Sequence, residues 1–201
     1  SSEPVASVPV NAGVMESSQL PLETTEMWAI LAQGRVKPVG TYAKEIMVSV
    51  SGKTEVDGLT ALDVFWGCHF DWPTFSDLPI VKISSSTLRQ DLGFESGVRR
   101  FSYNHLILHE AFQSLVREGL NAERTKEPAT PNQRDAVEVY RRLDLLAEIA
   151  DGHSLQLVPK AGADGLWTWP ASLENSEVAA DQKIITQFGL LAQAYLNKDG
   201  D

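Results

Sequence analysis

The stretch from Gln33 to Gly52 constrains the fold most, because it holds an ordered series of start and stop signals. Gly34 can end a helix predicted over about residues 25–33, since glycine adopts a positive φ there without steric cost. Pro38 disfavours the α-helical region for the residue before it, so residues 35–37 are expected to be extended. The stretch therefore predicts a helix, a short extended segment and a second helix.

Arg35 and Lys37 form a basic pair within the extended segment, because residues two apart project from the same side of a strand. The chain carries 27 acidic and 17 basic side chains, for a net charge of −10. Pairing of both cations with this acidic surface is one interpretation. The other is a binding role for Arg35 and Lys37.

The second helix of this stretch is predicted to begin after Thr41, a plausible N-cap, and to end at Gly52. Its apolar residues recur at the i, i+3, i+4, i+7 spacing of one helical face. They are Ala43, Ile46, Met47 and Val50. This face is expected to lie in the core.

Further helices are predicted from capping signals and apolar periodicity. The clearest is Thr130-Pro131-Asn132-Gln133, where a threonine N-cap precedes a proline and the glutamine completes a capping box. Predicted helices cover residues 60–70, a short segment after 85–86, 104–119, 131–151 and 176–196; short strands are predicted within 79–83, 98–103 and 154–159. The fold class expected is mainly α with a few short β-strands, a compact helical domain with a small sheet.

Composition limits the partners and the domain count. We expect residues 1–22, rich in serine, proline and valine, to be a linker or extended arm, and 23–201 to form one helical domain. The acidic balance argues against a nucleic-acid partner. No stretch approaches the roughly 18 consecutive apolar residues needed to cross a bilayer.

Two features suggest catalytic or metal chemistry only weakly. His105 and His109 are four apart on a predicted helix with Glu110 beside them, a spacing that brings two imidazoles to one face. No third ligand lies nearby, so they are weak metal candidates, and solvated or packing histidines are the preferred interpretation. Cys68 is the sole cysteine and is expected to be a buried structural thiol.

Five tryptophans are many for this length. Trp167 and Trp169 flank Thr168, so an extended backbone would place both indoles on one side. Aromatic residues in this arrangement act more often as core or interface anchors than as a surface for a flat ligand. An interface platform is therefore expected here.

Several segments carry a family resemblance. QGRVKPVGTYAKEIMVSVSGK is followed by LTALDVFWG, LPIVKISSSTLRQDLG, RRFSYNHL and RRLDLLAEIADGHSLQLVP, in that order. The series resembles the large extracytoplasmic insertion of cytochrome c biogenesis proteins, the fused ResB-like and CcsA-like haem-exporting cytochrome c synthetases. The likeness covers about residues 27–169.

The resemblance implies an accessory domain on the periplasmic or extracytoplasmic side, anchored through segments outside this sequence. It implies as partners the membrane-embedded part of the same polypeptide and apocytochrome c, with haem handled by the parent protein. The family's haem-handling motif is not carried over, because Pro170 stands where that motif needs an acid. Arg35, Lys37, Trp167 and Trp169 are then the candidate surface for a partner or a haem propionate. The alternative is a stand-alone enzyme or ligand-binding protein with a pocket near His105 and His109.

Overall fold

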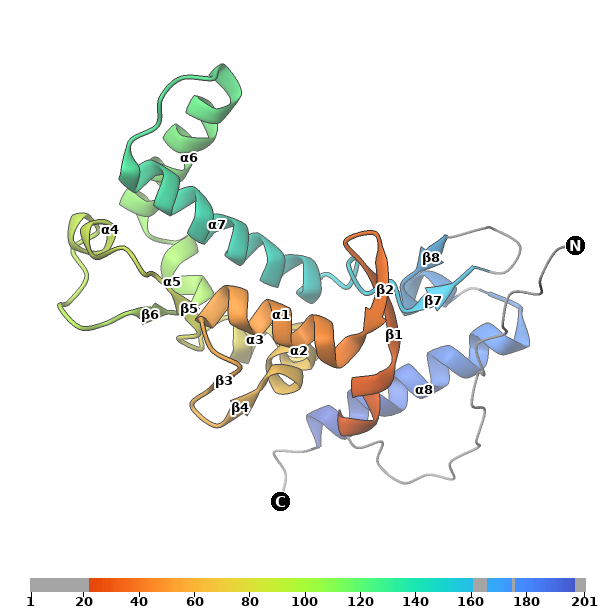
Figure 1. Ribbon diagram of the computed structural model, residues 1–201. Helices are drawn as coiled ribbons and strands as arrows, with labels where there is room; N and C mark the ends of the chain where they lie inside the picture. Colours follow the sequence, from red (N-terminus) through yellow and green to blue (C-terminus); the bar gives the residue numbers. More distant parts are fainter. Residues whose placement is uncertain (1–21, 161–165, 175, 198–201) are drawn as a thin grey trace, which may run out of the picture.

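Figure 1 shows the computed structural model, which describes residues 22–160, 166–174 and 176–197. The helices are α1 (Val39–Ser51), α2 (Ala61–Phe70), α3 (Trp72–Phe75), α4 (Ser86–Asp91), α5 (Tyr103–Ile107), α6 (Glu110–Thr125), α7 (Pro131–Ala150) and α8 (Ala179–Leu196), with 3₁₀ turns η1 (Leu22–Met27) and η2 (Pro170–Leu173). The mainly α fold class is confirmed. Apart from Leu22, the predicted arm over 1–22 lies outside the described residues.

Within the part of the chain that the structure describes, the strands form four antiparallel pairs, each of two strands. These are β1 (Ala29–Ala32) with β2 (Arg35–Pro38), β3 (Glu55–Val56) with β4 (Leu59–Thr60), β5 (Val81–Lys82) with β6 (Arg100–Phe101), and β7 (Val158–Pro159) with β8 (Trp167–Thr168). The strands predicted within 79–83, 98–103 and 154–159 are therefore present but shorter. These small two-stranded sheets agree with the few short β-strands expected beside the helices.

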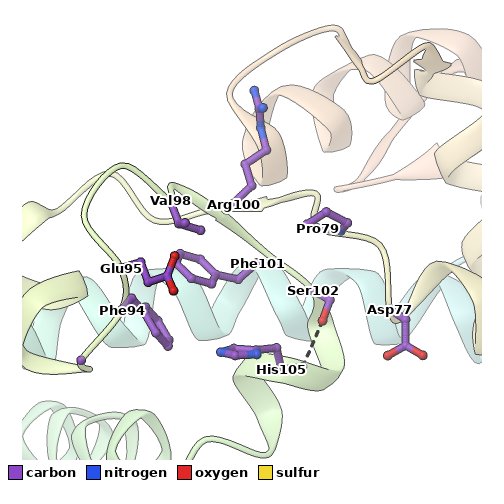
Figure 2. Close-up of a pocket in the computed structure, with 10 residues that line it drawn as sticks. Asp77, Pro79, Phe94, Glu95, Val98, Arg100, Phe101, Ser102 and His105 are labelled. Carbon is purple, nitrogen blue, oxygen red and sulfur yellow. Dashed lines mark hydrogen bonds between the residues drawn. The ribbon is translucent and has the colours of Figure 1, made fainter.

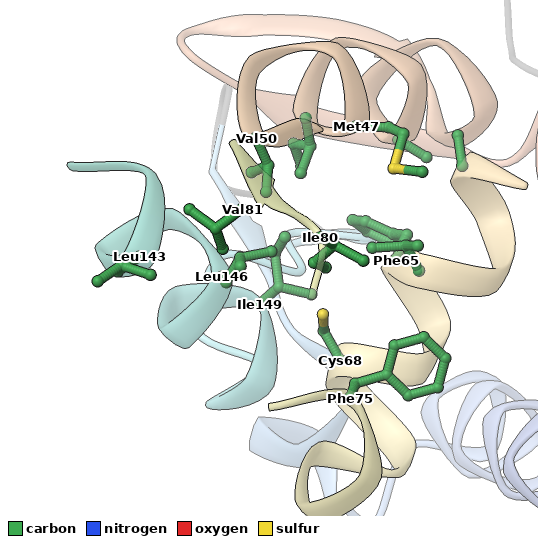
Figure 3. Packing of buried hydrophobic residues seen from close by; sticks show 14 of the residues in the cluster. Met47, Val50, Phe65, Cys68, Phe75, Ile80, Val81, Leu143, Leu146 and Ile149 are labelled. Atoms are coloured by element: carbon green, nitrogen blue, oxygen red, sulfur yellow. The ribbon is translucent and has the colours of Figure 1, made fainter. Parts of the chain in front are cut away.

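Helix α2 lies at the centre of the core and packs against α1, α7 and α8. Its buried residues include Val64, Phe65 and Cys68. Figure 3 shows Phe65 and Cys68 turned toward the buried side chains of α1 and α7. Each side of α2 is covered because its sequence is apolar nearly all round, which is typical of a central helix. The predicted stripe of α1 is buried as expected.

The N-terminal turn η1 is fastened to α2 by a buried hydrogen bond. The Trp66 indole N–H donates to the Thr25 hydroxyl at 2.8 Å, and that hydroxyl donates to the Leu22 carbonyl at 2.6 Å. A fully buried indole N–H needs such an acceptor, because an unpaired buried donor costs about 1–3 kcal/mol. This contact holds the chain entering β1 against the core.

The capping box predicted at Thr130 is confirmed, and α2 begins with a second one. Thr60 and Asp63 cap α2 reciprocally, and Thr130 and Gln133 do the same for α7. In each box the hydroxyl accepts an amide N–H of the first turn while the third residue accepts the N-cap amide. The short helix predicted after residues 85–86 is present as α4, where the Ser85 hydroxyl accepts the Leu88 N–H.

The helix predicted over residues 25–33 is wrong. η1 ends at Met27, and β1 then pairs with β2 through a two-residue turn at Gln33 and Gly34, where φ is +53° and +73°. Positive φ at both turn residues defines the type I′ turn that matches strand twist. Gly34 therefore lies in the turn that reverses the chain between β1 and β2, and it does not end a helix.

Two further helix boundaries differ from expectation. α1 begins at Val39, with Pro38 at the N-cap position, so Thr41 lies inside the helix and does not cap it; Gly52 ends it as predicted, with φ of +73°. The helix predicted over 104–119 is divided into α5 and α6. Leu108 lies at this break and is 79% exposed.

Candidate functional site

Lys37 is held by the protein itself. On β2 its ammonium lies 2.7 Å from the Glu45 carboxylate of α1 and 5.7 Å from the centre of the Tyr42 ring, and its side chain is 15% exposed. Burial raises the pKa of the Tyr42 hydroxyl, and the carboxylates of Glu148 and Glu45 raise it further, so the ring stays neutral beneath the cation. Lys37 therefore fastens the hairpin to α1.

Arg35 is the free member of the basic pair. It is exposed beside the type I′ turn and forms no ion pair with any residue that the structure describes. Its neighbour Val36 is 58% exposed on the other face of the strand. The interpretation in which acidic side chains neutralise both cations thus holds for Lys37 alone.

Trp167 and Trp169 lie on β8 and just after it. Trp167 pairs with Pro159 across the β7–β8 ribbon, while the Trp169 ring lies 4.9 Å from the ring of His153. Thr168, between them, is buried and its hydroxyl is 2.5 Å from that of Ser172. Both indoles are half-buried, so each keeps part of its surface open to a partner.

The β1–β2 and β7–β8 ribbons lie side by side at one end of the molecule (Figure 1). The Leu31 N–H of β1 donates to the Gln156 carbonyl at 2.9 Å, which joins the two regions directly. The fold therefore brings Arg35, Lys37, Trp167 and Trp169 to the same end, although about 130 residues separate the pairs along the chain. We call this end the hairpin end.

A second feature is an open hollow of about 490 Å³ bordered by the loop after α4, by β6 and by α5, shown in Figure 2. The rings of Phe94 and Phe101 stack at 4.2 Å, and the His105 ring lies 5.3 Å from Phe94 and 5.8 Å from Phe101. His105 is exposed, while Glu95 and Asp77 border the rim. The hollow thus offers aromatic faces, one imidazole and two carboxylates.

His105 and His109 are not on one continuous helix, which corrects the sequence prediction. His109 is the N-cap of α6, and its Nδ1 accepts the Phe112 N–H at 3.3 Å. The two imidazole centres are 6.2 Å apart. Because capping uses the Nδ1 lone pair, the neutral ring carries its proton on Nε2, which suits packing better than metal ligation. Within the described ranges, no three His, Cys, Asp or Glu side chains form a metal-binding group.

Cys68 is a structural thiol, as predicted. It is 1% exposed among the core residues of α1, α2 and α7 (Figure 3). Burial raises the pKa of this thiol to about 12, so it stays protonated at neutral pH. A protonated, covered sulfur is a poor nucleophile.

His69 and a set of three basic residues are not among the site residues that the sequence predicted. His69 on α2 is largely buried, and its Nδ1 lies 3.1 Å from the Ile149 carbonyl. Lys82, Arg100 and Arg142 come together around β5 and β6. The burial of His69 had a local signal, since this residue follows the apolar stripe of its helix. The meeting of Lys82, Arg100 and Arg142 had none, because it depends on strand pairing between distant segments.

Comparisons of the sequence with models of protein families and with curated proteins gave no match. Among the helices of the described ranges, none is long and apolar enough to cross a membrane.

Proposed function

We propose that this chain is an accessory extracytoplasmic domain of a membrane-bound cytochrome c maturation protein, and that it acts by recognising a partner. The partners proposed are apocytochrome c and the membrane-embedded part of the same polypeptide. The order of the resembling segments supports the proposal, and the free guanidinium of Arg35 at the hairpin end is the observation that carries it.

The hairpin end has the chemistry of a recognition surface. An arginine binds a carboxylate through two parallel charge-assisted hydrogen bonds, and both acidic protein side chains and haem propionates carry carboxylates. Half-buried indoles supply apolar contact area at small entropic cost, which is why tryptophan and arginine are enriched among residues that dominate binding energy. Arg35, Trp167 and Trp169 together supply both kinds of contact.

The first test compares Arg35→Ala with Arg117→Ala, because Arg117 is also exposed and has no ion pair within the described residues. Each purified protein is titrated with haemin, followed by Soret absorbance and tryptophan fluorescence, and with immobilised apocytochrome c. We expect Arg35→Ala to weaken binding of the recognised partner about tenfold, the loss of one charge-assisted contact. Arg117→Ala should bind as the wild type does.

Binding of apocytochrome c without any haemin response would assign the domain to partner recognition. A haemin response lost in Arg35→Ala would assign it to propionate binding. Equal binding by both variants, or no binding of either ligand, would contradict a role for the hairpin end.

The hollow beside His105 favours a second candidate function, a stand-alone enzyme or ligand-binding protein. Its stacked Phe94 and Phe101 rings are suited to a small aromatic ligand. A screen of aromatic fragments by NMR would test it, with Phe94→Ala expected to abolish binding and His153→Ala, at the hairpin end, expected to leave it unchanged. Absence of any fragment bound at Phe94 would contradict this function.

A further inference from the structure

Three basic side chains gather on the β5–β6 ribbon. Lys82 and Arg100 are direct partners across the two strands, and the Arg142 guanidinium of α7 donates to the Lys82 carbonyl at 2.9 Å. The next residue, Ile83, donates its N–H to the Arg99 carbonyl. Since hydrogen-bonded and non-hydrogen-bonded pairs alternate along an antiparallel ladder, Lys82 and Arg100 occupy the latter kind, in which side chains lie closer.

This arrangement places two like charges opposite each other, which is destabilising. Residues directly opposite each other project from the same face of the ribbon, so Lys82 and Arg100 share one face. Their neighbours Val81 and Phe101 project from the other face and are buried in the core. The repulsion is therefore not relieved by turning one cation to the other face.

None of the three cations has a carboxylate partner within the described residues. All three are half-buried, whereas the exposed Lys44 and Arg141 are paired with glutamates. Partly desolvated charges are normally paired, and a chain with 27 acidic side chains has carboxylates to spare. Burial therefore favours a counter-charge at this ribbon, yet none of the described residues supplies one.

Arg100 is the least satisfied of the three. Its side chain makes no hydrogen bond to any described residue, and its Nε is covered from solvent without an acceptor. Arg100 borders the hollow, but Figure 2 shows its side chain extending away from Phe94 and His105. Five guanidinium N–H groups therefore point at no protein acceptor that the structure describes.

The other two cations are only partly satisfied by backbone. A Cβ placed on Gly52 would lie 3.1 Å from the Lys82 ammonium, so that ammonium sits against the C-terminal end of α1, where the helix dipole is negative. Arg142 uses one Nη for the Lys82 carbonyl. Several donors of both side chains remain available.

We propose that Lys82, Arg100 and Arg142 form a binding site for a phosphate group. A phosphate carries up to two negative charges and several acceptor oxygens, which matches three cations with unused donors better than a single carboxylate does. Bound phosphate would also neutralise the repulsion between Lys82 and Arg100. The phosphate can come from a soluble molecule or from a lipid headgroup, and the site does not depend on the function proposed above.

Isothermal titration of the purified protein with inorganic phosphate, at an ionic strength held constant with chloride, tests the site. We expect saturable binding, with affinity reduced about tenfold or more in Arg100→Gln and in Lys82→Gln. Arg141→Gln is the matched control, since it removes a neighbouring cation that already has glutamate partners. Because phosphate also stabilises proteins by exclusion from their surface, only the difference between variants counts.

Thermal unfolding without phosphate supplies an independent check on folding. Arg100→Gln should unfold at a temperature no lower than the wild type, because the substitution removes the repulsion with Lys82. Phosphate should then raise the unfolding temperature of the wild type and of Arg141→Gln more than that of Arg100→Gln.

Co-sedimentation with phosphatidic acid vesicles distinguishes the sources. Binding to vesicles that is lost in Arg100→Gln assigns a lipid headgroup; binding of inorganic phosphate alone assigns a soluble phosphate. Absence of saturable phosphate binding, or equal affinity in the wild type, Arg100→Gln and Lys82→Gln, overturns the proposal.

Discussion

His69 lies where α2, α7 and α8 meet. Its Nδ1 is 3.1 Å from the Ile149 carbonyl of α7, and its ring is 5.6 Å from the Phe188 ring of α8. Burial lowers the pKa of His69 from its ordinary 6.5, against the opposing effect of hydrogen bonds to the Ile149 and Ala150 backbone. The unfolded chain therefore binds this proton more readily than the folded one.

The lowered pKa predicts a loss of stability on acidification. His69 contributes stability that is fully present above the ordinary value of 6.5 and is lost as the pH falls from there toward the lower folded-state pKa. His69→Gln keeps a polar side chain with amide donors but has no titrating ring. We expect its free energy of unfolding in urea to fall less than that of the wild type between about pH 7.5 and about pH 5.5.

His153→Gln, which changes an exposed histidine, serves as the control and should retain the wild-type dependence on pH. An unchanged dependence in His69→Gln would show that carboxylates, and not this imidazole, dominate the acid response.

At the scale of single elements, α6 and α7 pack closely against each other at Gly119. A Cβ at this position would lie 2.6 Å from Val137 Cγ2 and 2.9 Å from the Gln133 carbonyl oxygen. The second contact is with helix backbone, which cannot yield as a flexible side chain does. The two helix axes therefore approach as closely as they do because no side chain separates them.

Gly119→Ala is expected to destabilise the protein by about 1–3 kcal/mol, the usual cost of overpacking. Gly189→Ala is the matched control, because Gly189 also lies within a helix but has nothing near its missing Cβ. The control should be stabilising by about 0.5–1 kcal/mol through helix propensity alone. Equal effects of the two substitutions in urea unfolding would contradict close packing of α6 on α7.

The sequence predicted those elements whose signals lie within a few neighbouring residues. α2 and α7 could be predicted because each capping box lies within four residues of its helix. β1 could not, since Gly34 supplies the same positive φ to a helix end and to a type I′ turn, and only pairing with β2 decides between them. The break before α6 was missed because histidine is an uncommon N-cap.

For the whole molecule, long-range contacts decide both candidate surfaces. The sequence predicted the residue types at the hairpin end, but their common location depends on Leu31 bonding to Gln156. It gave no indication that Lys82 and Arg100 are partners, because a two-residue strand has too short a pattern to specify its mate. Such features follow from tertiary packing.

α8 is the most lightly held of the long helices. Of its 18 residues only Leu191 and Tyr195 are buried, while Phe188 contacts the rings of Trp66 and Phe70. Few buried apolar contacts predict local opening at a low free energy. We expect amides of α8 to exchange with deuterium faster than those of α7, and Phe188→Ala to speed exchange further in α8 alone.

Leu190→Ala, on the exposed side of the same helix, should leave this exchange unchanged. Simultaneous exchange of α7 and α8 would instead show that the two helices open as one cooperative unit.

The β1–β2 hairpin has one more consequence. Its two-residue turn makes Ala32 and Arg35 a hydrogen-bonded pair. Along the outer edge of β2, the N–H and C=O groups of Val36 therefore point away from β1. Pro38, the next residue whose groups face this edge, has no N–H. A strand from another molecule could form backbone hydrogen bonds with Val36 alone, because β2 ends at Pro38 and α1 begins at the next residue. This edge is therefore protected against edge-to-edge pairing with other molecules and against fibril formation, although the apolar side chain of Val36 is exposed there.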